Sequence, residues 1–152
     1  MSGASIFTST QATAVFLRFH ADARRLDACN GGHNPPLLFR AGGEVERLAR
    51  GGPALGVLRG MTYMEESFTL APGDLLVVYT DGVVEARNER RELFGIERVI
   101  EAVRGCAGGS ALGVRERILG SLAEHTGALP PGDDVTLVVV RVTGDAAAEG
   151  AR

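Results

Sequence analysis

The first part of the chain alternates short apolar runs with polar or glycine-rich turns, a pattern typical of β-strands. An apolar, β-prone run over residues 14–19 ends at the polar turn 22–25 and resumes over residues 26–29, so we expect a hairpin. Residues 30–36 contain two glycines and two prolines, which disfavour a regular strand ladder. We therefore expect an irregular loop after the first hairpin.

The β pattern continues to about residue 79. Residues 37–39 and 45–48 flank a glycine-containing turn, which predicts a second hairpin. Polar and apolar positions roughly alternate over residues 63–70, as in a half-buried strand. Residues 71–74 then form a turn, and the apolar run 75–79 is typical of a central strand that is buried on both faces.

Beyond Asn88 the spacing of apolar residues changes to three and four, which indicates helices. One stripe runs from Leu93 to Val103 and ends at the glycines 105–109. Ser110 is a good cap for a second helix, which should stop near Gly127. Its stripe consists of Val114, Ile118 and Leu122.

A loop over residues 129–134 leads to a last valine-rich strand over residues 135–142, apolar enough to be central. Strands, then two helices, then one strand is the order of an α+β fold with helices on an antiparallel sheet. Residues from Thr143 onward are small and polar and are expected to form a frayed tail.

Composition restricts the function classes. The 152 residues fit one domain, with 45% hydrophobic residues, 23% charged residues and a net charge of -3. This balance lacks the basic excess of nucleic-acid-binding proteins. The longest apolar runs are far shorter than the roughly 20 residues of a membrane span. The start has no secretory signal pattern, so we expect a cytoplasmic protein without a membrane anchor.

Any metal should be bound by carboxylates. Cys29 and Cys106 are far apart and are interpreted as reduced thiols. The three histidines, at positions 20, 33 and 125, are too scattered for a zinc site.

Two acidic positions fall at strand ends. Asp81 follows the run 75–79 after one residue, and Asp133 and Asp134 directly precede the last strand. If these strands are antiparallel neighbours, the carboxylates lie at the same edge and can share a hard cation such as Mg²⁺ or Mn²⁺. Aspartates at such positions are also ordinary turn residues, so spacing alone leaves both interpretations open.

Three motifs resemble those of bacterial SpoIIE/RsbU-type PPM phosphatases. Residues 72–88 read PGDLLVVYTDGVVEARN, and residues 92–95 read ELFG. Residues 30–37 read NGGHNPPL, and residues 132–139 read GDDVTLVV. Their order and gaps resemble the family's from about Ala12 to Val142.

The resemblance implies a PPM-phosphatase-like β-sandwich with flanking helices and a two-metal centre that holds Mn²⁺ or Mg²⁺. It implies that Asp81 and Asp133 are metal ligands and that Asp134, Gly82 and Asn34 support them. In this chemistry two ions about 4 Å apart activate a water for attack on phosphoserine or phosphothreonine. The implied activity is a metal-dependent protein serine/threonine phosphatase acting on a phosphorylated regulatory protein, such as an anti-sigma-factor antagonist.

Two further residues have weaker assignments. His33 either donates a proton to the leaving oxygen or, as we prefer, hydrogen-bonds its own loop. Arg87 either contacts phosphate or pairs with the nearby Glu85 and Glu89 on the surface. We rank both below the aspartates.

The family's upstream "GDV-x-G-x-G" segment, whose aspartate bridges the two metals, has no counterpart in residues 1–11. We therefore expect the C-terminal portion of the domain over residues 12–142, with a lead over 1–11, a disordered tail over 143–152 and the N-terminal part missing. Association with another chain or with the missing segment would then complete the fold. The alternative function is a truncated, catalytically inactive phosphatase-like interaction module.

Overall fold

The computed structural model describes four stretches of the chain, which are residues 11–22, 24–106, 108–130 and 132–144. The expected lead and tail lie outside these residues, apart from positions 11, 143 and 144.

The chain divides into two compact units. The first comprises residues up to His33 together with residues 49–68, and the second comprises residues 34–48 and those from Thr69 onward. Each is described by itself.

The first unit is built on a mixed sheet. Strands β1 (Ala14–His20) and β2 (Arg25–Gly31) form the expected antiparallel hairpin. Strand β2 also pairs with the short parallel strand β5 (Gly51–Gly52) and with β6 (Glu66–Thr69). The expectation that residues 30–36 are wholly irregular is wrong for Asn30 and Gly31, which belong to β2. Strand β2 continues through Gly31 because its last two residues pair with β5.

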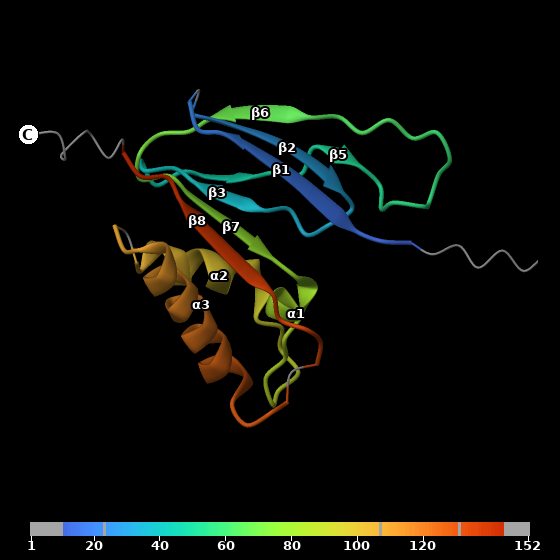
Figure 1. Cartoon of the computed structure of the whole chain (residues 1–152). Helices are drawn as coiled ribbons and strands as arrows, with labels where there is room; N and C mark the ends of the chain where they lie inside the picture. Colours follow the sequence, from blue (N-terminus) through green and yellow to red (C-terminus); the bar gives the residue numbers. More distant parts are fainter. Residues whose placement is uncertain (1–10, 23, 107, 131, 145–152) are drawn as a thin grey trace, which may run out of the picture. The chain divides into compact units, whose positions relative to one another are not determined.

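The second unit contains an antiparallel sheet in the order β4-β3-β7-β8 (Figure 1). Its strands are β3 (Leu37–Phe39), β4 (Val45–Arg47), β7 (Leu75–Tyr79) and β8 (Leu137–Arg141). The second hairpin is confirmed, and β7 is a central strand as expected.

Strand β8 differs from the expectation of a central strand. Among the described residues it pairs only with β7, so it lies at an edge of the sheet. Four of its five side chains are half-buried, and the fifth, Val138, is 49% exposed. A valine-rich run indicates a preference for the β-strand conformation, and this preference does not distinguish an edge strand from a central strand.

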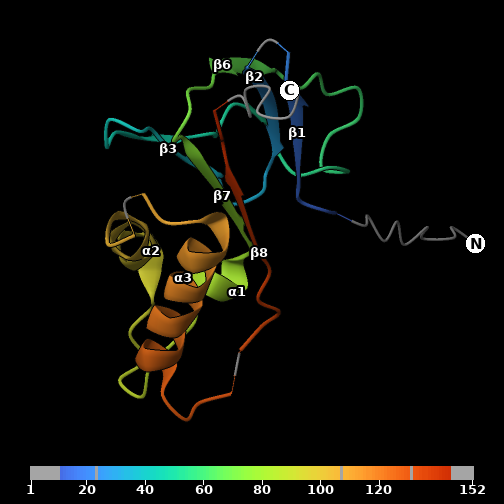
Figure 2. The ribbon, with the colours of Figure 1, turned by 60° about the vertical axis from the view of Figure 1, so that its left-hand side comes forward.

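Helices α2 (Gly95–Arg104) and α3 (Ala111–Thr126) lie side by side next to β7 and β8 (Figures 1 and 2). Ser110 caps α3, because its side chain accepts a hydrogen bond from the Gly113 amide. The helix ends at Thr126 and is followed by Gly127, whose φ of 59° suits glycine. A one-turn helix, α1 (Asp81–Val84), was not expected from the sequence, because four residues are too few for a periodic stripe.

One core joins the helices to this sheet. Val99 of α2 and Ile118 of α3 are fully buried against sheet residues such as Val77 and Tyr79. The prediction that both helical stripes cover one sheet is therefore confirmed. No helix of the described residues is long and apolar enough to cross a membrane.

The turn before β7 is organised by Asp74, whose side chain is almost completely buried. Its Oδ1 accepts a hydrogen bond from the Ala41 amide (2.9 Å), and its Oδ2 accepts one from the Ala71 amide (3.0 Å). Oδ2 also pairs with Arg40 Nη1 at 3.0 Å. Asp74 therefore ties the β3–β4 turn to the start of β7.

Candidate metal centre

Asp81 and Asp133 lie at the same end of the β7–β8 pair. Tyr79 at the end of β7 pairs with Leu137 at the start of β8, so the chain leaves one strand where it enters the other. Asp81 is the first residue of α1, and Asp133 lies in the loop before β8. The antiparallel arrangement on which the shared-edge argument depended is present.

Thr80 holds this end of the strand pair together. Its hydroxyl donates to the Asp134 carbonyl oxygen and accepts from the Thr136 amide, both at 2.9 Å. The Thr80 amide donates to the Thr136 carbonyl oxygen at 3.1 Å. Asp134 thus contributes a backbone oxygen to the local structure, a role that its acidic side chain did not predict.

Gly82 allows the loop before β8 to approach the end of β7. A Cβ atom at this position would lie 2.4 Å from the Asp134 carbonyl oxygen and 3.3 Å from the Asp133 carbonyl oxygen. The first distance is shorter than real Cβ contacts and the second is tight, so the close approach requires glycine here. The TDG sequence therefore brings the two aspartate-containing segments together.

Each aspartate is oriented by a backbone amide. Asp81 Oδ1 accepts a hydrogen bond from the Gly82 amide (3.0 Å), and Asp133 Oδ1 accepts one from the Asp134 amide (2.7 Å). Both residues are exposed. Among the described residues these are the hydrogen bonds of the two carboxylates, and Oδ2 of each makes none.

Both aspartates line one cavity of about 440 Å³. It also contains Glu85 and Arg87. Glu85 was interpreted only as a surface partner for Arg87. Its position four residues after Asp81 is the signal that could have identified Glu85 as a residue of this cavity, since one helical turn places both side chains on the same face. The Glu85 amide donates to the Asp81 carbonyl oxygen at 2.8 Å, which closes that turn.

The donor set fits a hydrated hard cation. Mg²⁺ keeps several waters and is commonly bound by one or two carboxylates, and Asp81 and Asp133 provide two at one cavity. Among the described residues no group of three acidic, histidine or cysteine side chains is placed to hold a metal. The pair therefore suits partial coordination of one ion.

Arg87 lies at the cavity of the two aspartates, whereas His33 is not among the residues that line it. Arg87 lines the cavity, and its Nη1 donates to the Arg91 carbonyl oxygen at 3.1 Å. His33 belongs to the first unit, where its amide donates to Asn30 Oδ1 (2.8 Å) and its carbonyl oxygen accepts from Asn30 Nδ2 (3.0 Å). Asn34 begins the second unit and is half-buried.

The sequence analysis missed a polar cluster around Asp27 in the first unit. The Asp27 side chain is buried and accepts hydrogen bonds from Ser67 Oγ (2.7 Å) and Arg18 Nη2 (2.9 Å). His20 Nε2 lies 2.8 Å away, and Arg25 Nε lies 3.0 Å away. The hydrogen bonds from Ser67, Arg18 and His20 hold the pKa of Asp27 well below its ordinary value of 3.8. Alternation places Arg18 and His20 on one face of β1 and Arg25 and Asp27 on one face of β2, but it did not reveal that these residues meet Ser67 of β6.

Comparison with known proteins identifies the family. The family model for "Stage II sporulation protein E (SpoIIE)" matches residues 4–143. The chain belongs to this family. A curated relative, Protein IcfG of Synechocystis sp. (strain ATCC 27184 / PCC 6803 / Kazusa), is 31% identical over 115 residues, which cover 76% of this chain and 18% of that protein.

Solved structures show the same fold. The SiaA-PP2C domain of Pseudomonas aeruginosa has a TM-score of 0.67 and 28% identity, covering 79% of this chain and 47% of that one. The RsbU and RsbW domains of Rv1364c from Mycobacterium tuberculosis have a TM-score of 0.69 and 26% identity, covering 90% of this chain and 37% of that one. The expected PP2C-like α+β fold is confirmed, and the chain spans less than half the length of these relatives.

Proposed function

We propose that this chain supplies part of the catalytic centre of a metal-dependent protein serine/threonine phosphatase, with Asp81 and Asp133 as ligands of Mn²⁺ or Mg²⁺. The observation that carries the proposal is the position of both carboxylates on one cavity at the paired ends of β7 and β8. Membership of the SpoIIE family and the PP2C-like fold support the reaction class.

In this proposal the residues of the chain would bind the cation and orient its carboxylate ligands. Asp81 and Asp133 would bind the cation through Oδ2, while the Gly82 and Asp134 amides fix Oδ1 of each carboxylate. When bound, the metal ions supply an activated water and charge neutralisation for attack on a phosphate monoester. Gly82 and the Asp134 backbone would support this arrangement by keeping the two segments in contact.

Arg87 is our candidate for substrate binding. It lines the same cavity, and its guanidinium is suited to bidentate recognition of a phosphate. Asn34 and His33 remain weaker candidates, since the His33 backbone is bonded to the Asn30 side chain and its ring Nδ1 lies 3.4 Å from Thr13 Oγ1. The proposed substrate is phosphoserine or phosphothreonine on a regulatory protein such as an anti-sigma-factor antagonist, which the resemblance to RsbU-type phosphatases suggests.

Metal binding by the chain tests the proposal without depending on activity. We would titrate Mn²⁺ into the 152-residue chain and measure free Mn²⁺ by electron paramagnetic resonance. Two carboxylates should give weak binding, which Asp81→Asn or Asp133→Asn should weaken about tenfold or more, because each removes a charged ligand. Asparagine can still accept the amide hydrogen bond, so the local fold is retained.

The matched control is Glu89→Gln, which removes an exposed carboxylate that does not line the cavity and should leave Mn²⁺ affinity unchanged. Equal affinity in the wild type and both aspartate variants would contradict the ligand assignment. The same result, with hydrolysis absent in any form of the protein, would favour the interaction-module alternative.

A further inference from the structure

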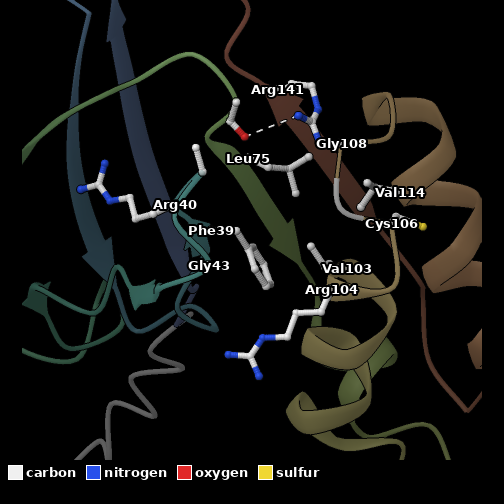
Figure 3. Close-up of a pocket in the computed structure, with 12 residues that line it drawn as sticks. Phe39, Arg40, Gly43, Leu75, Val103, Arg104, Cys106, Gly108, Val114 and Arg141 are labelled. Carbon is white, nitrogen blue, oxygen red and sulfur yellow. Dashed lines mark hydrogen bonds between the residues drawn. The ribbon is translucent and has the colours of Figure 1, made fainter.

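A second cavity, of about 150 Å³, lies in the second unit between the sheet and the helices (Figure 3). Its apolar wall consists of Phe39, Leu75, Val103 and Val114, all of them core residues. An apolar cavity of about this size is large enough for a benzene ring. The space therefore fits one ring-sized apolar group.

This cavity lies at the opposite end of β7 from the aspartates. Leu75 opens β7 and pairs with Arg141 at the end of β8, whereas Tyr79 and Leu137 pair next to Asp81. The two cavities share no lining residue. A ligand here would bind away from the proposed metal centre.

Arg141 provides a poorly paired cation at this cavity. Its Nη1 reaches the Gly73 carbonyl oxygen at 3.5 Å, the outer limit of a hydrogen bond. Its Nε is buried and has no hydrogen-bond partner among the described residues. A buried donor without a partner costs free energy, so a rotation that gives this guanidinium an anionic partner would be favourable.

The other arginines around the cavity differ from Arg141. Arg40 is already paired with Glu46 and with Asp74. Arg104 is exposed at the end of α2, and in Figure 3 its guanidinium extends away from Val103. The surroundings of the cavity thus carry excess positive charge, and one guanidinium lacks a good partner.

We propose that this cavity binds a small aromatic carboxylate of about the size of benzoate. The ring would occupy the space between Phe39, Leu75 and Val114, and the carboxylate would accept hydrogen bonds from the Arg141 guanidinium. A carboxylate matches the charge of one guanidinium, whereas a phosphate monoester would leave a second charge without a partner in an apolar site. The proposal does not depend on the proposed phosphatase activity.

The test is a titration of the 152-residue chain, labelled with carbon-13 at leucine and valine methyl groups, with three probes of equal ring size. Benzoate should shift the methyl signals of Leu75, Val103 and Val114 in a saturable way. Benzyl alcohol should bind about tenfold or more weakly, because it lacks the charge that pairs with Arg141. Benzylamine should not bind, because its ammonium group would face a guanidinium.

Variants then separate the contribution of the Arg141 charge to the affinity from that of the apolar space. Arg141→Met keeps the apolar stem and should reduce benzoate affinity to that of benzyl alcohol, without changing the latter. Val103→Phe should fill the space and prevent binding of both. The control Arg115→Met removes an exposed arginine from α3 and should change nothing.

Failure of benzoate to shift these methyl signals would overturn the proposal. So would equal affinity for benzoate and benzylamine, a comparison that needs no variant and so does not depend on any variant folding. Retained benzoate affinity in Arg141→Met would exclude the assigned charge contact.

Discussion

Gly82 lies directly against the backbone of Asp134, so closely that a Cβ atom would stand 2.4 Å from the Asp134 carbonyl oxygen. Gly82→Ala must therefore displace the loop before β8 or the end of β7. We expect a loss of about 1–3 kcal/mol in the free energy of unfolding, the usual cost of forcing an extra methyl group into a packed site. We also expect weaker Mn²⁺ binding, because the displacement separates Asp81 from Asp133.

Gly132→Ala is the matched control for this prediction. Gly132 lies in the same loop, and a Cβ atom there would meet nothing within 4 Å. Urea unfolding and Mn²⁺ titration of both variants measure the two effects. Equal behaviour of Gly82→Ala and Gly132→Ala would contradict the role given to the close contact.

The sequence predicted the strands around this site better than the local detail of the site. The apolar run of β7 and the turn residues beside it predicted that Asp81 follows a central strand, and the structure shows the antiparallel pairing with β8 that the shared-edge argument required. Helix α1 and the cavity position of Glu85 were not predicted, because a single turn has too few residues to show periodicity. Gly82 was recognised through a motif, whereas the reason for glycine is a tertiary contact 52 residues along the chain.

Asp74 was visible in the sequence only as part of a turn, yet its carboxylate joins two turns and pairs with Arg40. Asp74→Asn replaces one carboxylate oxygen with an NH₂ group, which then faces a backbone amide or the Arg40 guanidinium, both of them donors. Arg40 keeps its ion pair with Glu46 in this variant, so the cost comes from the buried amide donors of Ala41 and Ala71, one of which loses its acceptor. We expect a loss of about 1–3 kcal/mol in the free energy of unfolding, the usual cost of leaving a buried donor without a partner. Urea unfolding is the measurement.

Asp22→Asn is the comparison for Asp74→Asn, because Asp22 is exposed at the β1–β2 turn. It should change the free energy of unfolding by less than about 0.5 kcal/mol. A similarly small effect for Asp74→Asn would show that the buried contacts of Asp74 contribute little to stability.

The Asp27 cluster predicts a particular dependence of stability on pH. Because the pKa of Asp27 is lower in the folded protein than its ordinary value of 3.8, the ionised form stabilises the fold at higher pH. That contribution is present above pH 3.8 and is lost as the pH falls below it toward the folded-state pKa. In acid, Asp27 of the unfolded chain takes up a proton before Asp27 of the folded chain does.

The measurement is the free energy of unfolding of the wild type and Asp27→Asn at several pH values from neutral to acid. The variant should be less stable at neutral pH, and the difference should shrink as the pH falls below 3.8. A difference that stays constant across this range would mean that ionisation of Asp27 does not contribute.

The central claim is the proposal that Asp81 and Asp133 hold metal for phosphate ester hydrolysis, in a centre that the bridging aspartate of the family's "GDV-x-G-x-G" segment would complete. We would measure hydrolysis of a phosphoserine peptide with millimolar Mn²⁺ by the 152-residue chain and by a chain extended with the family's upstream "GDV-x-G-x-G" segment. The account predicts turnover only by the extended chain, lowered more than about a hundredfold by Asp81→Asn or Asp133→Asn and unchanged by Glu89→Gln. Robust turnover by the 152-residue chain alone, or an active extended chain insensitive to both aspartate substitutions, would contradict it.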